Sequence, residues 1–159
     1  MGEYAERVRH AGFFIALLST IVLGAVNDAR EKAQVKKKNE IARQYINALE
    51  LYRNDNPNIG YPTTGNQFEC LGYNVSETCF LIMDGSPALN NLIANYYPAM
   101  PKNDDFIVSA SGNITKGIMY RCPSSDSCYL RWYLPNDQDC IYGKTANNEE
   151  NHTECTYDL

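Results

Sequence analysis

The feature that most constrains the fold is an uninterrupted stretch from Gly12 to Tyr52 that contains no proline. It opens with an almost purely apolar run, Phe13 to Val26, and continues through a charged segment rich in Ala, Glu, Lys, Arg and Gln, which are strong helix formers. The next helix-breaking sequence is Asn-Asp-Asn-Pro at residues 54–57. We therefore predict one long helix over residues 13–53.

The last turns of this helix have the periodicity of a face packed against a core. Ile41, Tyr45, Leu49 and Tyr52 recur at spacings of four, four and three residues. The pattern therefore predicts that residues 41–52 form an amphipathic segment with one buried face. The residues that widen the apolar stripe are Ala42, Ile46 and Ala48.

The middle of the helix lacks this pattern. Between Arg30 and Asn39 only Ala33 and Val35 interrupt the polar residues. Such a segment either faces solvent or contacts another chain. For the run Lys36 to Lys38 we expect at least two side chains on a solvated helix face.

All six cysteines lie after the predicted helix. An even number of cysteines in a small domain after an apolar segment indicates three disulfides and an exported location. Fifteen pairings are possible, and we favour pairs of sequence neighbours. A zinc site is disfavoured because there is no Cys-x-x-Cys and the only histidines are His10 and His152. The predicted disulfides are Cys70–Cys79, Cys122–Cys128 and Cys140–Cys155.

The second half of the chain has the pattern of an antiparallel sheet. Apolar and polar side chains alternate over residues 117–122 and 128–134, with a turn between them. A second helix begins at Ser86-Pro87, with Leu89, Leu92, Ile93 and Tyr96 as its expected buried face. A small sheet covering the amphipathic half of the long helix is an α+β fold. The predicted strands are 106–110, 117–122, 128–134, 140–142 and 154–159, and residues 68–80 are predicted to be a loop.

Two motifs resemble the type IV pilin and pseudopilin family. Arg7, Arg9 and His10 precede Gly12-Phe13 and the apolar run, which looks like a prepilin leader and its cleavage point. The sequence ALELYRNDNPNIGYPTT, residues 48–64, is similar to the helix-end signature of pilin-like proteins.

The resemblance implies a division of the chain and a set of site residues. Residues 1–12 would be a leader, 13–53 the long helix with its membrane or filament-core part at 13–26, and 54–159 a globular α+β head. Gly12 and Phe13 would flank the processing site, and Phe13 would become the methylated N-terminus. The expected assembly residues are Phe13, Phe14, Ile15, Leu17, Leu18, Ile21, Val22 and Leu23.

The resemblance also implies a function. The chain would be a structural subunit of a type IV pilus-like or pseudopilus filament, held in the cell membrane before assembly and then part of a cell-surface or extracellular filament. Its partners would be further copies, other pilin-like subunits, the inner membrane and a prepilin peptidase. No cofactor or metal is implied.

One departure from the family pattern keeps an alternative open. Leu17 occupies the position, five residues past the cleavage point, where the family has a glutamate. The apolar run from Ala11 to Val26 spans about 24 Å of helix, against about 30 Å for a bilayer core. The alternative is a monomeric exported or membrane-anchored binding module that forms no filament.

Charge and motif content disfavour other classes of function. Residues 1–53 carry nine Lys or Arg and six Asp or Glu, a net charge of +3, whereas residues 54–159 carry five and thirteen, a net charge of −8. An acidic head disfavours nucleic acid as a partner. No nucleophile–base pair, phosphate loop or metalloprotease motif is present, which disfavours an enzyme. Acids on predicted turns leave calcium open but match no EF-hand spacing. They are Asp104, Asp105, Asp126, Asp137 and Asp139.

Overall fold

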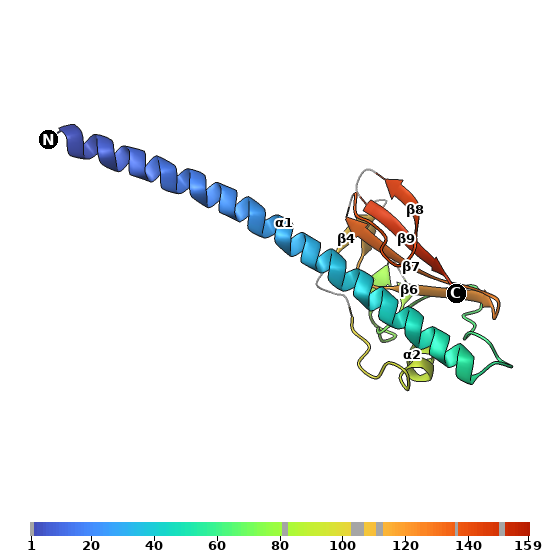
Figure 1. Cartoon of the computed structure of the whole chain (residues 1–159). Coiled ribbons are helices and arrows are strands. Elements are labelled where there is room, and N and C mark those ends of the chain that lie inside the picture. Colours follow the sequence, from blue (N-terminus) through green and yellow to red (C-terminus); the bar gives the residue numbers. More distant parts are fainter. Residues whose placement is uncertain (1, 81–82, 103–106, 111–112, 136, 150–151) are drawn as a thin grey trace. The chain divides into compact units, whose positions relative to one another are not determined.

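The structure is a computed structural model that describes residues 2–80, 83–102, 107–110, 113–135, 137–149 and 152–159 (Figure 1). In the long helix, the side chains are described from Ile21 onward. The chain forms two units, residues 1–34 and 35–159, and each is treated by itself below. The second unit therefore includes the end of the long helix, whereas the sequence placed the start of the head at residue 54.

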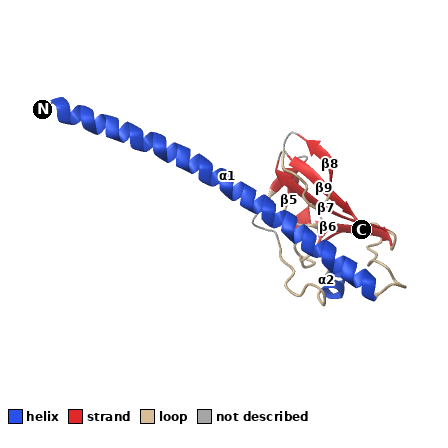
Figure 2. Ribbon diagram, in the orientation of Figure 1, coloured by secondary structure: helices blue, strands red, loops and turns tan. Residues whose placement is uncertain are grey.

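Helix α1 runs from Gly2 to Asp55 (Figure 2). It begins eleven residues before the predicted start, so the leader-like segment 2–12 is itself helical. The helix ends where Asn56 caps it: both its backbone N–H, at 3.0 Å, and its Nδ2, at 2.8 Å, donate to the carbonyl of Tyr52. Pro57 follows and cannot supply a backbone donor, so the helix stops at the predicted turn.

The end of α1 buries the face that the sequence predicts. Tyr45 and Leu49 are fully buried, and Tyr52 retains 8% of its exposure. All residues of the stripe are buried, and all except Ala48 and Tyr52 belong to the hydrophobic core that they share with side chains from the sheet. The residues of this stripe are Ile41, Ala42, Tyr45, Ile46, Ala48, Leu49 and Tyr52.

The main sheet has five antiparallel strands in the order β1-β6-β7-β9-β8. Its central strand, β7, alternates as predicted, with Leu130, Trp132 and Leu134 fully buried and facing the core. The fold is therefore α+β, as the sequence indicates, with one long helix and an antiparallel sheet. The strand bounds are β1 Phe68–Cys70, β6 Met119–Ser124, β7 Ser127–Pro135, β8 Lys144–Glu149 and β9 His152–Asp158.

A second, smaller sheet was not predicted as a separate element. Its order is β3-β2-β5-β4, and its strands are only two or three residues long. Strands this short cannot show a periodicity of two in the sequence, which explains why residues 68–80, predicted as a loop, contain β1 and β2. The bounds are β2 Thr78–Phe80, β3 Met83–Asp84, β4 Val108–Ala110 and β5 Asn113–Thr115.

The strand predicted at residues 140–142 is wrong. Residues 141–142 form a turn, and the strand β8 begins at Lys144. The sequence Lys-Thr-Ala-Asn-Asn-Glu shows no apolar alternation because β8 is the edge strand and Lys144, Thr145, Ala146 and Asn147 are all exposed. Pairing with β9, rather than burial, makes this segment extended.

Helix α2, Pro87–Ile93, begins as predicted and buries Leu89 and Ile93 of the expected face. Ser86 is the N-cap, and its Oγ accepts from the backbone N–H of Leu89 at 3.3 Å. Leu92, expected inside, is 45% exposed, and Asn90 is buried instead. The Asn90 side chain accepts from the N–H of Gly72 and donates to the carbonyl of Tyr73, at 3.0 and 2.8 Å. These hydrogen bonds satisfy backbone groups of the loop and also the buried amide of Asn90, which offsets the cost of removing that amide from water.

The three disulfides have the sequence-neighbour pairing that we predict. Cys122–Cys128 closes the β6–β7 hairpin, and Cys140–Cys155 ties the turn before β8 to β9. Cys70–Cys79 joins β1 of the main sheet to β2 of the small sheet. This last bond fixes two three-residue strands that could not bury enough apolar surface to be stable alone.

Candidate assembly surface

The second unit holds the end of α1 through packing and specific hydrogen bonds. The hydroxyl of Tyr45 donates to the carbonyl of Pro101 at 3.2 Å, and its ring meets that of Tyr97 edge to face. Burial raises the pKa of Tyr45, so its hydroxyl remains a donor at neutral pH. The indole Nε1 of Trp132 donates to Oδ1 of the buried Asn39 at 3.2 Å. This part of α1 is therefore fixed within the second unit.

The part of α1 before Gln34 has a different environment. Every residue from Ile21 to Ala33 is exposed. The side chains of Ile21, Val22 and Leu23 are 65%, 57% and 62% exposed, and that of Val26 is 41% exposed. Burying one such side chain contributes about 1.5–3 kcal/mol. Any partner that covers this segment therefore gains a large favourable free energy from burying its apolar side chains.

Ile21, Val22 and Leu23 are the expected assembly residues whose side chains can be placed. The backbone of the other expected residues is helical, but their side-chain environment is not described. These residues are the processing pair Gly12 and Phe13 and the assembly residues Phe14, Ile15, Leu17 and Leu18. Among the described residues, no helix has an apolar stretch sufficient to span a bilayer.

The charged side chains in the middle of α1, residues 30–38, are exposed with one exception. Lys36 and Lys37 are exposed, which fits the expectation of at least two solvated lysines. Lys38 is fully buried, and burial lowers its pKa from 10.5 to about 7. Sequence reasoning missed this because Lys38 lies in a run of charges. The available signal was its helical spacing, three residues after Val35 and four before Ala42, both of which are buried.

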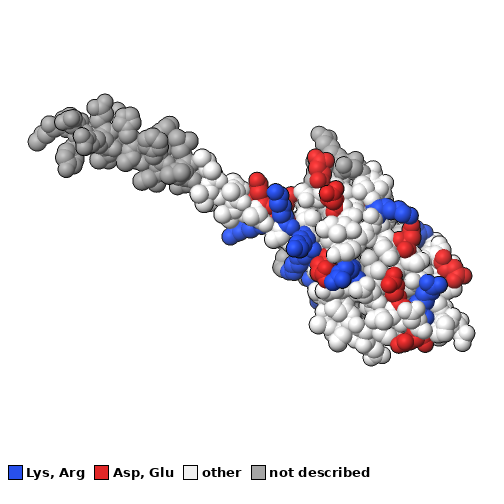
Figure 3. Space-filling model, viewed as in Figure 1, with Lys and Arg blue, Asp and Glu red and all other residues white. Residues whose placement is uncertain are grey.

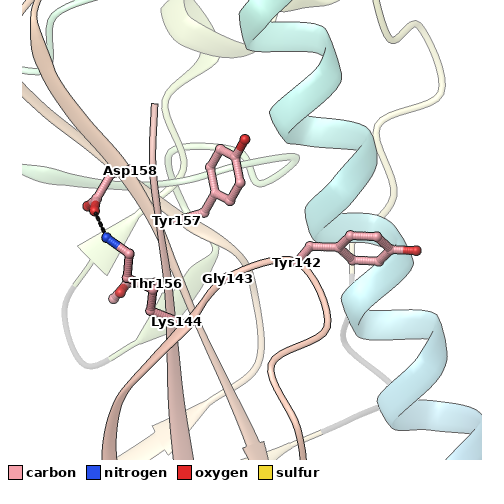
Figure 4. A pocket seen from close by; sticks show the side chains of 6 residues that line it. All are labelled: Tyr142, Gly143, Lys144, Thr156, Tyr157 and Asp158. Atoms are coloured by element: carbon pink, nitrogen blue, oxygen red, sulfur yellow. Dashed lines mark hydrogen bonds and ion pairs between the residues drawn. The ribbon is translucent and has the colours of Figure 1, made fainter.

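A surface cavity of about 300 Å³ lies where β8 begins beside the end of β9 (Figure 4). The ammonium of Lys144 and the carboxylate of Asp158 pair at 3.0 Å, and the rings of Tyr142 and Tyr157 point away from that ion pair. Gly143 lines the cavity, and a Cβ at this position would collide with the carbonyl oxygen of Thr156. The cavity mixes aromatic surface with one charge of each sign.

The residues considered for chemistry are not assembled into a site. His152, which lies just before the predicted strand 154–159, is the first residue of β9, is 2% exposed and packs against the ring of Tyr133. Asp104 and Asp105 lie outside the described residues. Within the described ranges, no three His, Cys, Asp or Glu side chains gather where they could hold a metal ion.

Comparisons with known proteins leave the family open. No family model matches the chain, and no curated protein or solved structure is significantly similar to it. The assignment of a function therefore rests on the residues and geometry described above.

Proposed function

We propose that this chain is a structural subunit of a type IV pilus-like or pseudopilus filament, anchored in the membrane through its N-terminal helix before assembly. The observation that carries the proposal is the contrast within one helix. Residues 41–52 are locked into a disulfide-stapled head, whereas Ile21 to Ala33 are exposed on every side and include several large apolar residues. Helices of neighbouring copies are the partners that would cover this segment.

The mechanism is packing rather than catalysis. Apolar side chains of α1 bundle with those of neighbouring copies and leave water, which is the dominant favourable contribution to association. The heads then form the outer shell, and the disulfides keep them folded outside the cell. A prepilin peptidase would cleave between Gly12 and Phe13 before assembly.

The first test is the processing site. In cells that produce the full chain and a prepilin peptidase, intact mass analysis should find a subunit that begins at Phe13 and carries one additional methyl group. Gly12→Val should leave the full-length chain uncut, whereas the neighbouring Ala11→Val should be processed normally. A Gly12→Val protein with the same mature mass as the parent would remove Gly12 from the proposed role.

The second test is assembly. Leu23→Asp introduces a charge into the apolar segment without touching the head, because Leu23 is 62% exposed. We expect it to abolish sedimentable filaments in shear fractions while the head stays folded. Ile59→Asp is the matched control, since Ile59 is equally exposed, at 63%, but lies beyond α1. Equal filament yields from the two variants would contradict the proposed role of the segment.

The surface cavity favours the alternative, a monomeric binding module. Its two tyrosines and the Lys144–Asp158 pair would suit a small polar ligand. The two functions differ in self-association: a binding module stays monomeric when its N-terminal helix is intact, and a filament subunit polymerises.

A further inference from the structure

The exposed part of α1 carries a stripe of charge that bears on how copies would pack. Asp28, Lys32 and Lys36 recur every fourth residue, so they follow one side of the helix. All three are exposed, as is Glu31. Acidic and basic side chains gather along this stretch of α1 in Figure 3. We call Asp28 and Glu31 the acidic band, and Lys32 and Lys36 the basic band.

The order of the bands makes some packing arrangements unfavourable. In the proposed filament the N-termini share one membrane, so neighbouring helices are parallel. Two parallel helices in register would place each lysine beside the same lysine of the neighbour and each acid beside the same acid. Like charges on adjacent side chains repel, and opposite charges attract. A parallel pair in register is therefore opposed by both bands.

A shift of one helix along its axis replaces this repulsion between like charges with attraction between opposite charges. The centres of the two bands are between four and five residues apart, which is about 7 Å at 1.5 Å per residue. Sliding one helix by that amount brings the acidic band of one copy beside the basic band of the next. The bands are different surfaces, so one copy of the shifted pair keeps a free basic band and the other keeps a free acidic band. Such head-to-tail contacts do not close on themselves as a two-fold dimer does, and they extend into an open polymer.

We propose that the acidic and basic bands are an interaction surface for a second copy of this chain, and that their pairing sets an axial offset of about 7 Å between neighbouring helices. This inference rests on the proposed function. The apolar residues before the bands supply the strength of the contact. The charges select its register, because an exposed ion pair contributes little binding but like charges in contact disfavour the wrong alignment.

The test uses charge reversal in the full chain. One double variant, Lys32→Glu with Lys36→Glu, makes both bands acidic, and the other, Asp28→Lys with Glu31→Lys, makes both bands basic. We expect each to raise the minimum concentration for sedimentable polymer on the order of tenfold at low salt. The quadruple variant, with all four substitutions, restores the parent's net charge and exchanges the two bands. It should therefore polymerise like the parent.

A mixture of the two double variants separates contacts between chains from effects within one helix. Repulsion within one helix, between two acids at positions 28 and 32 after Lys32→Glu and between two lysines at those positions after Asp28→Lys, persists in the mixture. Pairing between chains is instead restored, so the mixture should co-sediment in equal amounts. Added salt at about 0.5 M should reduce the differences among all variants, because exposed charges are then screened.

The outcomes discriminate between this inference and the proposed function. If the parent polymerises and the double variants match it, or if the quadruple variant or the mixture fails to recover, the register inference is overturned while the filament stands. If the parent forms only discrete dimers, the axial offset is also overturned. A parent that stays monomeric at every concentration refutes both the filament and the inference that depends on it.

Discussion

Replacing the buried Lys38 with methionine should remove most of the pH dependence of folding between pH 7 and pH 9. Lys38 is fully buried, and burial lowers its pKa from 10.5 to about 7. In this range the unfolded chain holds a proton on Lys38 that the folded chain releases. Stability therefore rises as pH increases above about 7 and levels off near the unfolded pKa. Methionine has a similar length and no charge, so it fills the same space without titrating.

The magnitude follows from the two pKa values. At about 1.4 kcal/mol per pKa unit, the shift in the pKa of Lys38 corresponds to a change of about 5 kcal/mol in the free energy of unfolding. About 2 kcal/mol of this change falls between pH 7 and pH 9. Above that range the tyrosines begin to oppose the gain, because burial raises the pKa of Tyr45 and Tyr120 and the unfolded chain loses their protons first. Both proteins share that contribution, so it cancels in the comparison.

The assay is urea unfolding at pH 7 and pH 9 with the disulfides intact, followed by the fluorescence of the single tryptophan, Trp132, which is fully buried. The parent should gain about 2 kcal/mol over this interval and Lys38→Met should gain much less. Lys36→Met is the matched control, since Lys36 is exposed two residues away. If Lys38→Met gains as much stability as the parent, Lys38 is protonated in the folded state and the reasoning fails.

Two further substitutions, with one exposed control, test how the second unit holds α1. Leu49→Ala should lower the free energy of unfolding by about 2–5 kcal/mol because the side chain is fully buried, whereas Leu51→Ala, at a position 50% exposed, should change it by less than about 0.5 kcal/mol. Asn39→Ala removes the acceptor of the Trp132 indole and should cost about 1–3 kcal/mol; in the same urea assay, an unchanged midpoint would mean that water replaces the amide.

Much of the long helix could be predicted because its signals are local. Helix formers without a proline, an apolar stripe at helical spacing and an Asn-Pro stop all lie within the segment that they describe. The extension back to Gly2 was missed because the predicted helix was started at the apolar run, at Phe13, although no proline precedes that residue. The hairpin strands β6 and β7 were located for the same reason, since each is long enough to show alternation.

The elements that were missed depend on neighbours distant in the chain. Strand β8 is polar and exposed, and it exists because β9 offers a free edge. In α2, Leu92 is exposed and Asn90 is buried because the backbone of Gly72 and Tyr73 needs hydrogen-bond partners at that place. No periodicity in the sequence encodes either requirement.

The sequence by itself determined the long helix, its buried face and the α+β class, and it favoured the neighbour pairing of the cysteines, because each depends on residues close together in the chain. Only the tertiary structure decided which lysine of the run from Lys36 to Lys38 is buried. It also decided that the exposure of Ile21 to Ala33 extends around the whole helix. The physical reason is the same in both cases: a helix has many faces, and which of them meets water depends on what the rest of the chain brings against it.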